Sequence, residues 1–369
     1  FDGLLADADP VLSLDSASSE VLIGEQFAFT VNFENGSSQV GVAPFIDLFF
    51  PATGKDGAGE EVDDGITFIS ASYLGQMLNA HVLTFDASGQ AAHPLARDAG
   101  GNPVIVNAAD FGMQAGDQLV VVELPYASVS DGQPVIPITV TAQVSELADT
   151  RGAPDLTIKA RGGFEYGNDA LDNPEADPSL LGTAAGAQSF VVTPTVITLT
   201  AGVSAPEGET ATGPNYSRTL TITATPASGQ TISNATITQA LPANIQVTAI
   251  TPGAGGTLTS ITLANGVTVT NPGRIQDFIE LEDVFVTEFT IHYEDISAAA
   301  VTTVEFYIPE TDADGNVIVD PSTGDAVTIN IPAATGVGDW VPLDERDVDD
   351  AGTFSGTGEP ASVVAKSIT

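Results

Sequence analysis

A period-two alternation of apolar and polar residues restricts the fold of this chain more than any other feature. In EQFAFTVNFENG the large side chains alternate with smaller or polar ones, at Phe27, Phe29, Val31 and Phe33. Successive side chains of a β-strand point to opposite faces, so this spacing places all four on one face. The same spacing recurs in two later segments, at Ile136, Ile138, Val140, Ala142 and Val144 and at Phe285, Thr287, Phe289, Ile291 and Tyr293. The alternation predicts half-buried β-strands along most of the chain.

Turn signals between these segments indicate that the strands run antiparallel. In ITLANGVTV, Asn265 and Gly266 can adopt the positive φ values of a two-residue hairpin turn. GDQLVVVELPY is short, rich in valine and closed by Pro125, so we interpret it as a buried strand rather than a helix. No series of amphipathic helices alternates with the strands, which disfavours a parallel α/β sheet. The predicted fold class is all-β, with tandem antiparallel β-sandwiches.

Two segments about 180 residues apart share a pattern and predict an internal repeat. Gly65–Leu74 reads GITFISASYL, and Leu241–Ile250 reads LPANIQVTAI. Each follows an early alternating strand, GEQFAFTVNF in one half and SRTLTITAT in the other. Each also precedes a strand that ends in proline, LVVVELP or VEFYIP, so we expect these strands to be equivalent as well.

The order of these elements predicts the division of the chain into domains. We expect an N-terminal arm at 1–9, a first sandwich at 10–190, a second sandwich at 191–360 and a terminal strand at 361–369. The first sandwich would carry an insertion near 51–64 and a linker at 165–182. SVVAKSIT, within the terminal segment, has the pattern of the first strand of a further repeat.

The net charge limits the class of partner. The chain carries 49 acidic and 9 basic residues, a formal charge of −40, and such a surface repels phosphate backbones and anionic lipid headgroups. We therefore expect no nucleic acid and, because no apolar run is long enough to span a bilayer, no membrane insertion. The chain has no cysteine, which excludes disulfides and a cysteine nucleophile. FDGLLADADP lacks the features of a signal peptide, so we expect the numbering to start on a mature or excised chain.

Candidate catalytic residues are few. The three histidines are His81, His93 and His292, and no local sequence supplies an orienting partner for any of them. His292 has the opposite parity to Phe289, Ile291 and Tyr293, so it should face outward from its strand. No Gly-x-Ser-x-Gly segment lies between a strand and a helix. We therefore predict no catalytic residue, no organic cofactor and no enzymatic activity.

Calcium is the cofactor that the acidic turns suggest, because it binds carboxylate, amide and carbonyl oxygens in loops. NDALDNPEADP and ETDADGNVIVD supply eight candidate ligands, namely Asp169, Asp172, Asn173, Asp177, Asp312, Asp314, Asn316 and Asp320. The second group follows the spacing of an EF-hand loop only in part, since Val317 replaces the required glycine and Thr323 the terminal glutamate. Solvated acidic turns are the alternative explanation for both groups.

VLIGEQFAFTVNFENG followed by GITFISASY, together with PEGETATGPNYSRTLTITATPASGQTISNATITQALPANIQVTAI, resembles the conserved repeat domains of large bacterial and archaeal cell-surface proteins. VVAKSIT resembles the start of another copy, and GFEYGNDALDNPEADPSLLG resembles a linker between copies. The first half departs from the pattern, because residues 54–64 interrupt it and no Leu-Pro precedes GITF. The resemblance implies immunoglobulin-like sandwiches that serve as a spacer, adhesive stalk or lattice element.

These observations predict a non-enzymatic extracellular structural protein at the cell surface, an element of a surface layer, filament, matrix or adhesin stalk. Calcium would stiffen it, and terminal strands would pair between neighbouring copies or domains. Glycans or host surface ligands are further candidate partners. The alternatives are a carbohydrate-binding module or glycan-active surface protein, and a viral or phage surface protein. Asn35, Asn215 and Asn234 fit the N-glycosylation pattern, which threonine-rich chains also produce by chance.

Overall fold

The computed structural model of the chain describes residues 7–16, 19–55, 63–151, 154–168, 178–204, 218–240, 246–263, 268–270, 275–276, 288–309, 328–329, 353–354 and 365–368. Internal contacts divide the chain into two compact units, Phe1–Val196 and Ile197–Thr369. We call them unit 1 and unit 2. Among the described residues, no helix is long and apolar enough to cross a membrane.

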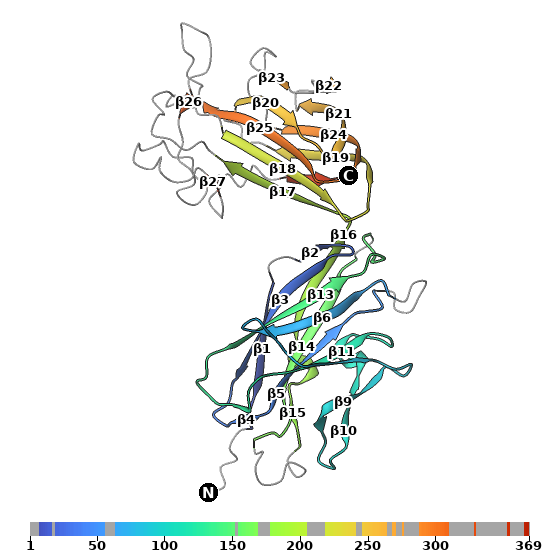
Figure 1. Cartoon of the computed structure of the whole chain (residues 1–369), viewed down its shortest axis with the longest axis vertical. Coiled ribbons are helices and arrows are strands. Elements are labelled where there is room, and N and C mark those ends of the chain that lie inside the picture. The colour runs from blue at the N-terminus through green and yellow to red at the C-terminus, as the bar shows by residue number, and fades with distance from the viewer. Residues whose placement is uncertain are drawn as a thin grey trace. The chain divides into compact units, whose positions relative to one another are not determined.

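Unit 1 contains two main β-sheets (Figure 1). The strand order of the first is β1 (Pro10–Ser16), β3 (Gln26–Asn35), β13 (Ile136–Val144), β6 (Ile66–Tyr73) and β7 (Gln76–Met77). The order of the second is β2 (Glu20–Leu22), β16 (Gln188–Thr195), β14 (Leu156–Phe164), β5 (Pro44–Phe50), β11 (Gln118–Glu123) and β8 (Ala80–Thr84), with β15 (Leu180–Leu181) beside β14. The smaller elements are the pair β4 (Gly41–Val42) and β12 (Ser128–Val129), the hairpin β9 (Gln90–Arg97) and β10 (Pro103–Asn107), and the short 3-10 helices η1 (Ala108–Phe111) and η2 (Ala184–Gly186).

The core between these two sheets follows the predicted alternation. In β3, Phe29, Val31 and Phe33 are buried, and the inward positions of β13 are buried in the same way. Phe29 meets Phe50 of the second sheet with ring centroids 6.5 Å apart, and Phe33 meets the edge of Phe164 at 5.6 Å. These contacts join the two sheets into a sandwich. The burial of β11 confirms that LVVVE is a buried strand.

The middle of the second sheet of unit 1, at β5 and most of β11, is covered on both of its faces. All seven residues of β5 are buried, although the strand reads PFIDLFF and its side chains alternate between the two faces. Phe45 and Phe49 point away from the sandwich core into a second apolar cluster that includes Phe111 of η1. Residues of β9, β10 and η1 form the other wall of this cluster, so they make a third layer over the sheet, which we call the flap.

Unit 2 has two main sheets of the same kind (Figure 1). The first has the order β23 (Ile275–Gln276), β20 (Gln246–Pro252), β25 (Ala300–Pro309), β18 (Arg218–Pro226), β17 (Ile197–Ser204) and β27 (Thr353–Phe354), with β26 (Thr328–Ile329) beside β25. The second has the order β22 (Thr268–Thr270), β21 (Gly256–Leu263), β24 (Glu288–Ile296), β19 (Ile232–Ala240) and β28 (Ala365–Ile368). In β24, Phe289, Ile291 and Tyr293 are buried and His292 lies on the other face, as the alternation predicts.

The two units repeat one strand order. The row β1-β3-β13-β6 of unit 1 corresponds to β17-β18-β25-β20 of unit 2, and β14-β5-β11-β8 corresponds to β28-β19-β24-β21. Corresponding strands also follow each other in the same sequence along the chain. The first of the two similar segments forms β6, and the described part of the second, from Gln246, lies in β20, which confirms that these are equivalent strands. The equivalence expected for LVVVELP and VEFYIP is wrong, because the first forms β11 of the second sheet and the second lies in β25 of the first sheet.

Two boundaries differ from those expected. The division between units falls after Val196 rather than after residue 190, because β16 pairs with β14 and β2 of unit 1. Residues of the terminal segment form β28, which pairs with β19 inside unit 2. The segment thus takes the place that β14 has in unit 1, rather than the first strand of a further repeat. Asn265, Gly266, Phe285 and Thr287 lie outside the described residues, although β21 and β22 pair antiparallel on either side of the predicted turn.

Candidate functional site

The predicted calcium ligands all fall in segments that the structure does not describe: Asp169, Asp172, Asn173, Asp177, Asp312, Asp314, Asn316 and Asp320. Among the described residues, no group of three or more histidine and acidic side chains is arranged to hold a metal ion. Calcium binding at the two acidic segments therefore stays a prediction. The described histidines and their partners are the remaining candidates for a functional site.

The histidines lie in three separate environments. His81, on β8, bonds Glu123 of β11 through Nε2 at 2.6 Å, and both side chains are partly exposed. His292 lies on the outward face of β24, where its Nε2 is 3.3 Å from Oγ1 of Thr262. His93 is the buried one, and its imidazole and the Asp47 carboxylate are both fully inaccessible to solvent.

Asp47, His93 and Arg161 form a buried polar cluster beneath the flap of unit 1, which we call the triad. Asp47 lies on β5 directly opposite Arg161 of β14 in the strand register. Its Oδ2 accepts a hydrogen bond from Arg161 Nε at 2.8 Å, and its Oδ1 lies 2.8 Å from His93 Nε2. Because His93 belongs to β9, one carboxylate connects the sheet to the flap.

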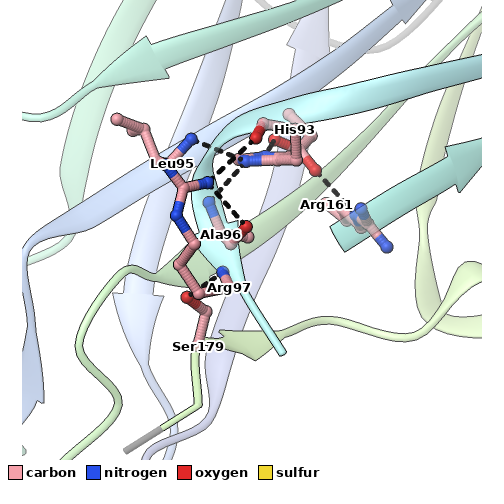
Figure 2. Close-up of polar contacts among 7 residues, drawn as sticks. His93, Leu95, Ala96, Arg97, Arg161 and Ser179 are labelled. Carbon is pink, nitrogen blue, oxygen red and sulfur yellow. Dashed lines mark hydrogen bonds and ion pairs between the residues drawn. The ribbon is translucent and has the colours of Figure 1, made fainter. Parts of the chain in front are cut away.

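The backbone around His93 fixes the tautomer of its ring. Nδ1 accepts hydrogen bonds from the N–H groups of Leu95, at 3.1 Å, and Ala96, at 2.7 Å (Figure 2). An imidazole nitrogen that accepts cannot carry a proton, so the proton lies on Nε2 and is donated to Asp47. These backbone donors are available because the β9–β10 ladder breaks here, with Ala92 paired to Ile105 and the next pair at Arg97 and Pro103.

Arg97 closes the same bend of β9. The Arg97 guanidinium donates to the carbonyl oxygens of His93, Pro94 and Ala96 at 3.2–3.3 Å (Figure 2). The backbone N–H of Arg97 donates to Ser179 Oγ at 2.8 Å. Ser179 Oγ in turn donates to the carbonyl of Glu165, after β14. The bend is therefore held at both ends by side chains from distant parts of unit 1.

Arg161 is sandwiched between charge and aromatic rings. Its guanidinium carbon lies 4.9 Å from the ring centre of Phe111 and 5.8 Å from that of Phe49. The two rings stack with centroids 3.8 Å apart and planes 11° from parallel. A cation over aromatic faces is stabilised by the ring quadrupole, most of all where water is excluded. The triad thus anchors η1 as well as β9.

This arrangement is suited to holding layers together rather than to chemistry. Both nitrogens of His93 are engaged, and neither His93 nor Asp47 is accessible to a substrate. A buried ion pair costs desolvation energy, but loss of one partner leaves an uncompensated charge and is strongly destabilising. We conclude that the triad fixes the position of the flap on the second sheet.

The three asparagines that fit the N-glycosylation pattern differ in their structural environment. Asn35 is buried, and its Nδ2 donates to the carbonyl oxygens of Gln39, at 2.6 Å, and Val129, at 2.9 Å. The folded chain therefore does not present this amide for modification. Asn234 is exposed and has a positive φ of 55°, and Asn215 lies outside the described part of the chain.

The strand order defines the chain as an all-β tandem of immunoglobulin-like sandwiches. No protein-family model matches the chain, and a search of curated proteins finds no similar sequence. A cohesin module from a Clostridium perfringens family 33 glycoside hydrolase is 10% identical, with 51% of this chain and 97% of that chain covered and a TM-score of 0.26. The C-terminal fragment of the major pilin GBS80 of Streptococcus agalactiae is 12% identical, with 85% and 89% covered and a TM-score of 0.23.

An enzyme is also among the similar structures. AvmM, which catalyses macrocyclization in alchivemycin A biosynthesis, is 13% identical to this chain, with 50% of this chain and 87% of AvmM covered and a TM-score of 0.27. At these identities and scores, none of the three structures assigns an activity or a partner to this chain.

Proposed function

We propose that the chain is a non-enzymatic extracellular structural protein that carries load in a surface layer, filament, matrix or adhesin stalk. The observation that supports this role is the pairing of the terminal strands of unit 1. β2, near the N-terminal end of the unit, runs parallel to β16, with which the unit ends. Thr193, Pro194 and Thr195 of β16 lie opposite Glu20, Val21 and Leu22 of β2.

Tension along the chain would load this pair in shear. A pull toward the N-terminus draws β2 one way along its axis, and a pull toward the C-terminus draws the parallel β16 the other way. Hydrogen bonds that cross between strands then resist together, whereas a pull from one end would open them one at a time. β1 adds to this resistance, because it is paired with β3 along its whole length from Pro10 to Ser16.

Apolar burial strengthens the same strands. Val21, Leu22 and Ile23 are buried, as is Val192 of β16. The Ile23 N–H donates to the carbonyl of Thr195 at 3.0 Å, and the Thr193 N–H donates to that of Ser19. Only Val196 separates the end of β16 from the start of β17, so the covalent path of tension from unit 2 enters β16 directly.

The direction of pulling tests this proposal within one protein. The chain has no cysteine, so pairs of introduced thiols can serve as unique handles for single-molecule force spectroscopy. Asp9→Cys with Val196→Cys pulls β1 and β16 along their axes. Glu25→Cys with Val196→Cys pulls β2 and β16 apart from the same end. We expect the first pair to require a clearly higher unfolding force, because forced unfolding follows the rate of barrier crossing. Equal forces would overturn the load-bearing role.

Calcium stiffening and self-assembly belong to the same proposal. Asn168, next to the first acidic segment, accepts a hydrogen bond from the Ala8 N–H at 2.8 Å and donates to Asp7 at 3.0 Å. An ion held by Asp169, Asp172, Asn173 and Asp177 would therefore stiffen the segment that follows Asn168, which itself is tied to Asp7 and Ala8. Thermal unfolding with calcium and with a chelator tests this, and identical midpoints would count against it.

Assembly between copies would use an edge strand. β28 pairs with β19 on one side, and within the described residues no strand pairs on its other side. β14, its counterpart in unit 1, pairs there with β16. An added strand would complete unit 2 in the same way. Electron microscopy of the full chain at high concentration is the test, and isolated monomers throughout would contradict assembly.

A further inference from the structure

The outward face of the second sheet of unit 2 carries a hollow of about 570 Å³. Three adjacent strands line it: β19, β24 and β21. Its polar lining includes Asn234, Thr236, Thr259, Ser260, His292 and Glu294. None of them belongs to the strand pairs that support the load-bearing role.

The hollow lies where the ladders of all three strands are interrupted. Between β24 and β21 the register shifts twice, between Thr257 and Leu258 and between Leu258 and Ser260, which leaves Glu294 and Thr259 outside the ladder. Asn234, on β19, is missing from the β19–β24 ladder at the same level, and its φ is 55°. Bulges bend a strand and re-aim its side chains, and they are common beside binding sites. A non-glycine residue at positive φ is likewise a conformation that needs a reason.

The chemistry of the lining selects among ligand classes. It combines one amide, several hydroxyls, one imidazole and one carboxylate, all of which form directional hydrogen bonds. Glu294 and the net charge of −40 oppose an anion. For a metal ion the described side chains supply too few strong ligands. A neutral molecule with many hydroxyl groups matches both the donors and the acceptors.

We propose that this hollow is a binding site for a neutral saccharide. Its volume is within the range of small-ligand sites and accommodates about one or two sugar rings. Tyr293 does not supply a stacking surface, because its ring is buried and its hydroxyl is 2.9 Å from Thr302 Oγ1 on the core side. Recognition through hydrogen bonds alone gives a weak site, with a dissociation constant on the order of 1 mM.

The three histidines provide the readout for a direct test. With ¹³C-labelled histidine the full chain gives three ring signals, of which His292 lines the hollow while His81 and His93 lie in unit 1. Titration with a panel of neutral hexoses, N-acetylhexosamines and their disaccharides should shift the His292 signal in a saturable way. His81 and His93 should not move, and acidic sugars should bind more weakly than their neutral counterparts.

Variants of the lining residues distinguish specific binding in the hollow from nonspecific effects of sugar on the protein surface. Asn234→Gly keeps the positive φ accessible and removes the amide, and Glu294→Gln keeps the shape and removes the charge. We expect each to weaken binding by about tenfold. Thr223→Val, on the outward face of β18 in the other sheet, is the matched control and should bind like the native chain. Absence of any His292 shift up to about 50 mM sugar overturns the proposal. So does a shift that survives both variants, provided that hydrogen exchange shows that they are folded.

Discussion

The two units build the same sheet and treat its outer face in opposite ways. In unit 1 the outer face of the row β14-β5-β11-β8 carries Phe45, Phe49 and Val121, and the flap covers this central part of it. In unit 2 the corresponding row β28-β19-β24-β21 presents polar side chains such as Thr236 and His292. In both units the core between the two sheets is formed by the alternating apolar residues of the strands. The second face is therefore where equivalent sheets acquire different roles.

This difference between the outer faces can be seen in the periodicity of apolar residues within single strands. β5 reads PFIDLFF and is buried at every position, whereas β24 alternates between buried and accessible positions. A continuous apolar run requires cover on both faces, and an alternating run requires it on one. The acid in the middle of PFIDLFF then needs buried partners, which His93 and Arg161 supply.

The largest expected effect breaks the covered face of unit 1. Asp47→Ala removes the partner of Arg161 and His93 and leaves a buried guanidinium uncompensated. We expect the free energy of unfolding of unit 1 to fall by about 3–5 kcal/mol. Denaturant unfolding followed by hydrogen exchange locates the loss, which should appear in β5, β9 and β14 and spare β24. An equal loss of protection in β24 would contradict the separate treatment of the two faces.

A slightly smaller effect is expected for the apolar part of the same face. Phe49→Ala removes the ring that stacks on Phe111 and lies beneath Arg161, at a cost of about 3–4 kcal/mol. Thr238→Ala, on the outer face of β19, is the matched change in unit 2 and should stay within about 0.5 kcal/mol. Urea midpoints of the two variants measure the contrast. Similar costs would mean that the face of unit 2 is also covered.

Much of the strand content could be predicted because it is a local signal. The alternation in β3, β13 and β24 and the buried run of β11 identify strands and their inward residues correctly. The equivalence of β6 and β20 also followed from local pattern. The predicted equivalence of LVVVELP and VEFYIP was wrong, because a strand that ends in proline can belong to either sheet. Sheet membership depends on long-range pairing, which local sequence does not contain.

The triad could not be predicted for a similar reason. Asp47 and His93 are 46 residues apart, and Asp47 and Arg161 are 114 apart. One signal was present, since an aspartate within PFIDLFF must find a partner once both faces of the strand are covered. The partner itself emerges only from the register of β5 with β14. The hollow of unit 2 could not be predicted either, because it depends on interruptions of the strand ladders that no turn residue in the sequence indicates.

An intermediate effect tests the packing between the two main sheets, a feature that each unit has on its own. Tyr293 of β24 and Thr302 of β25 join the two sheets of unit 2 through their hydroxyls. Burial raises the pKa of Tyr293 above its usual value, and the hydrogen bond with Thr302 partly lowers it. Thr302→Val should cost about 1–2 kcal/mol of stability in unit 2 and raise this pKa further. Tyrosinate absorbance titration and urea unfolding measure the two changes, and an unchanged titration would exclude the contact.

The smallest effect concerns the turns of the flap and appears only as pH dependence. Asp98, in the β9–β10 turn, accepts hydrogen bonds from the N–H groups of Asn102, at 2.9 Å, and Gly100, at 2.8 Å, which lower its pKa below the usual 3.8. A carboxylate with a depressed folded pKa stabilises the fold above its unfolded pKa and loses that contribution as pH falls through the folded value.

The native chain should therefore unfold at a higher temperature than Asp98→Asn at pH 6, and the difference should shrink to nothing in acid below the lowered pKa. Asp131→Asn, at an exposed loop position of unit 1, is the control for loss of one surface charge. Thermal melts across this pH range give the comparison. If the gap between the native chain and Asp98→Asn persisted in acid, the turn would be held by contacts other than this carboxylate.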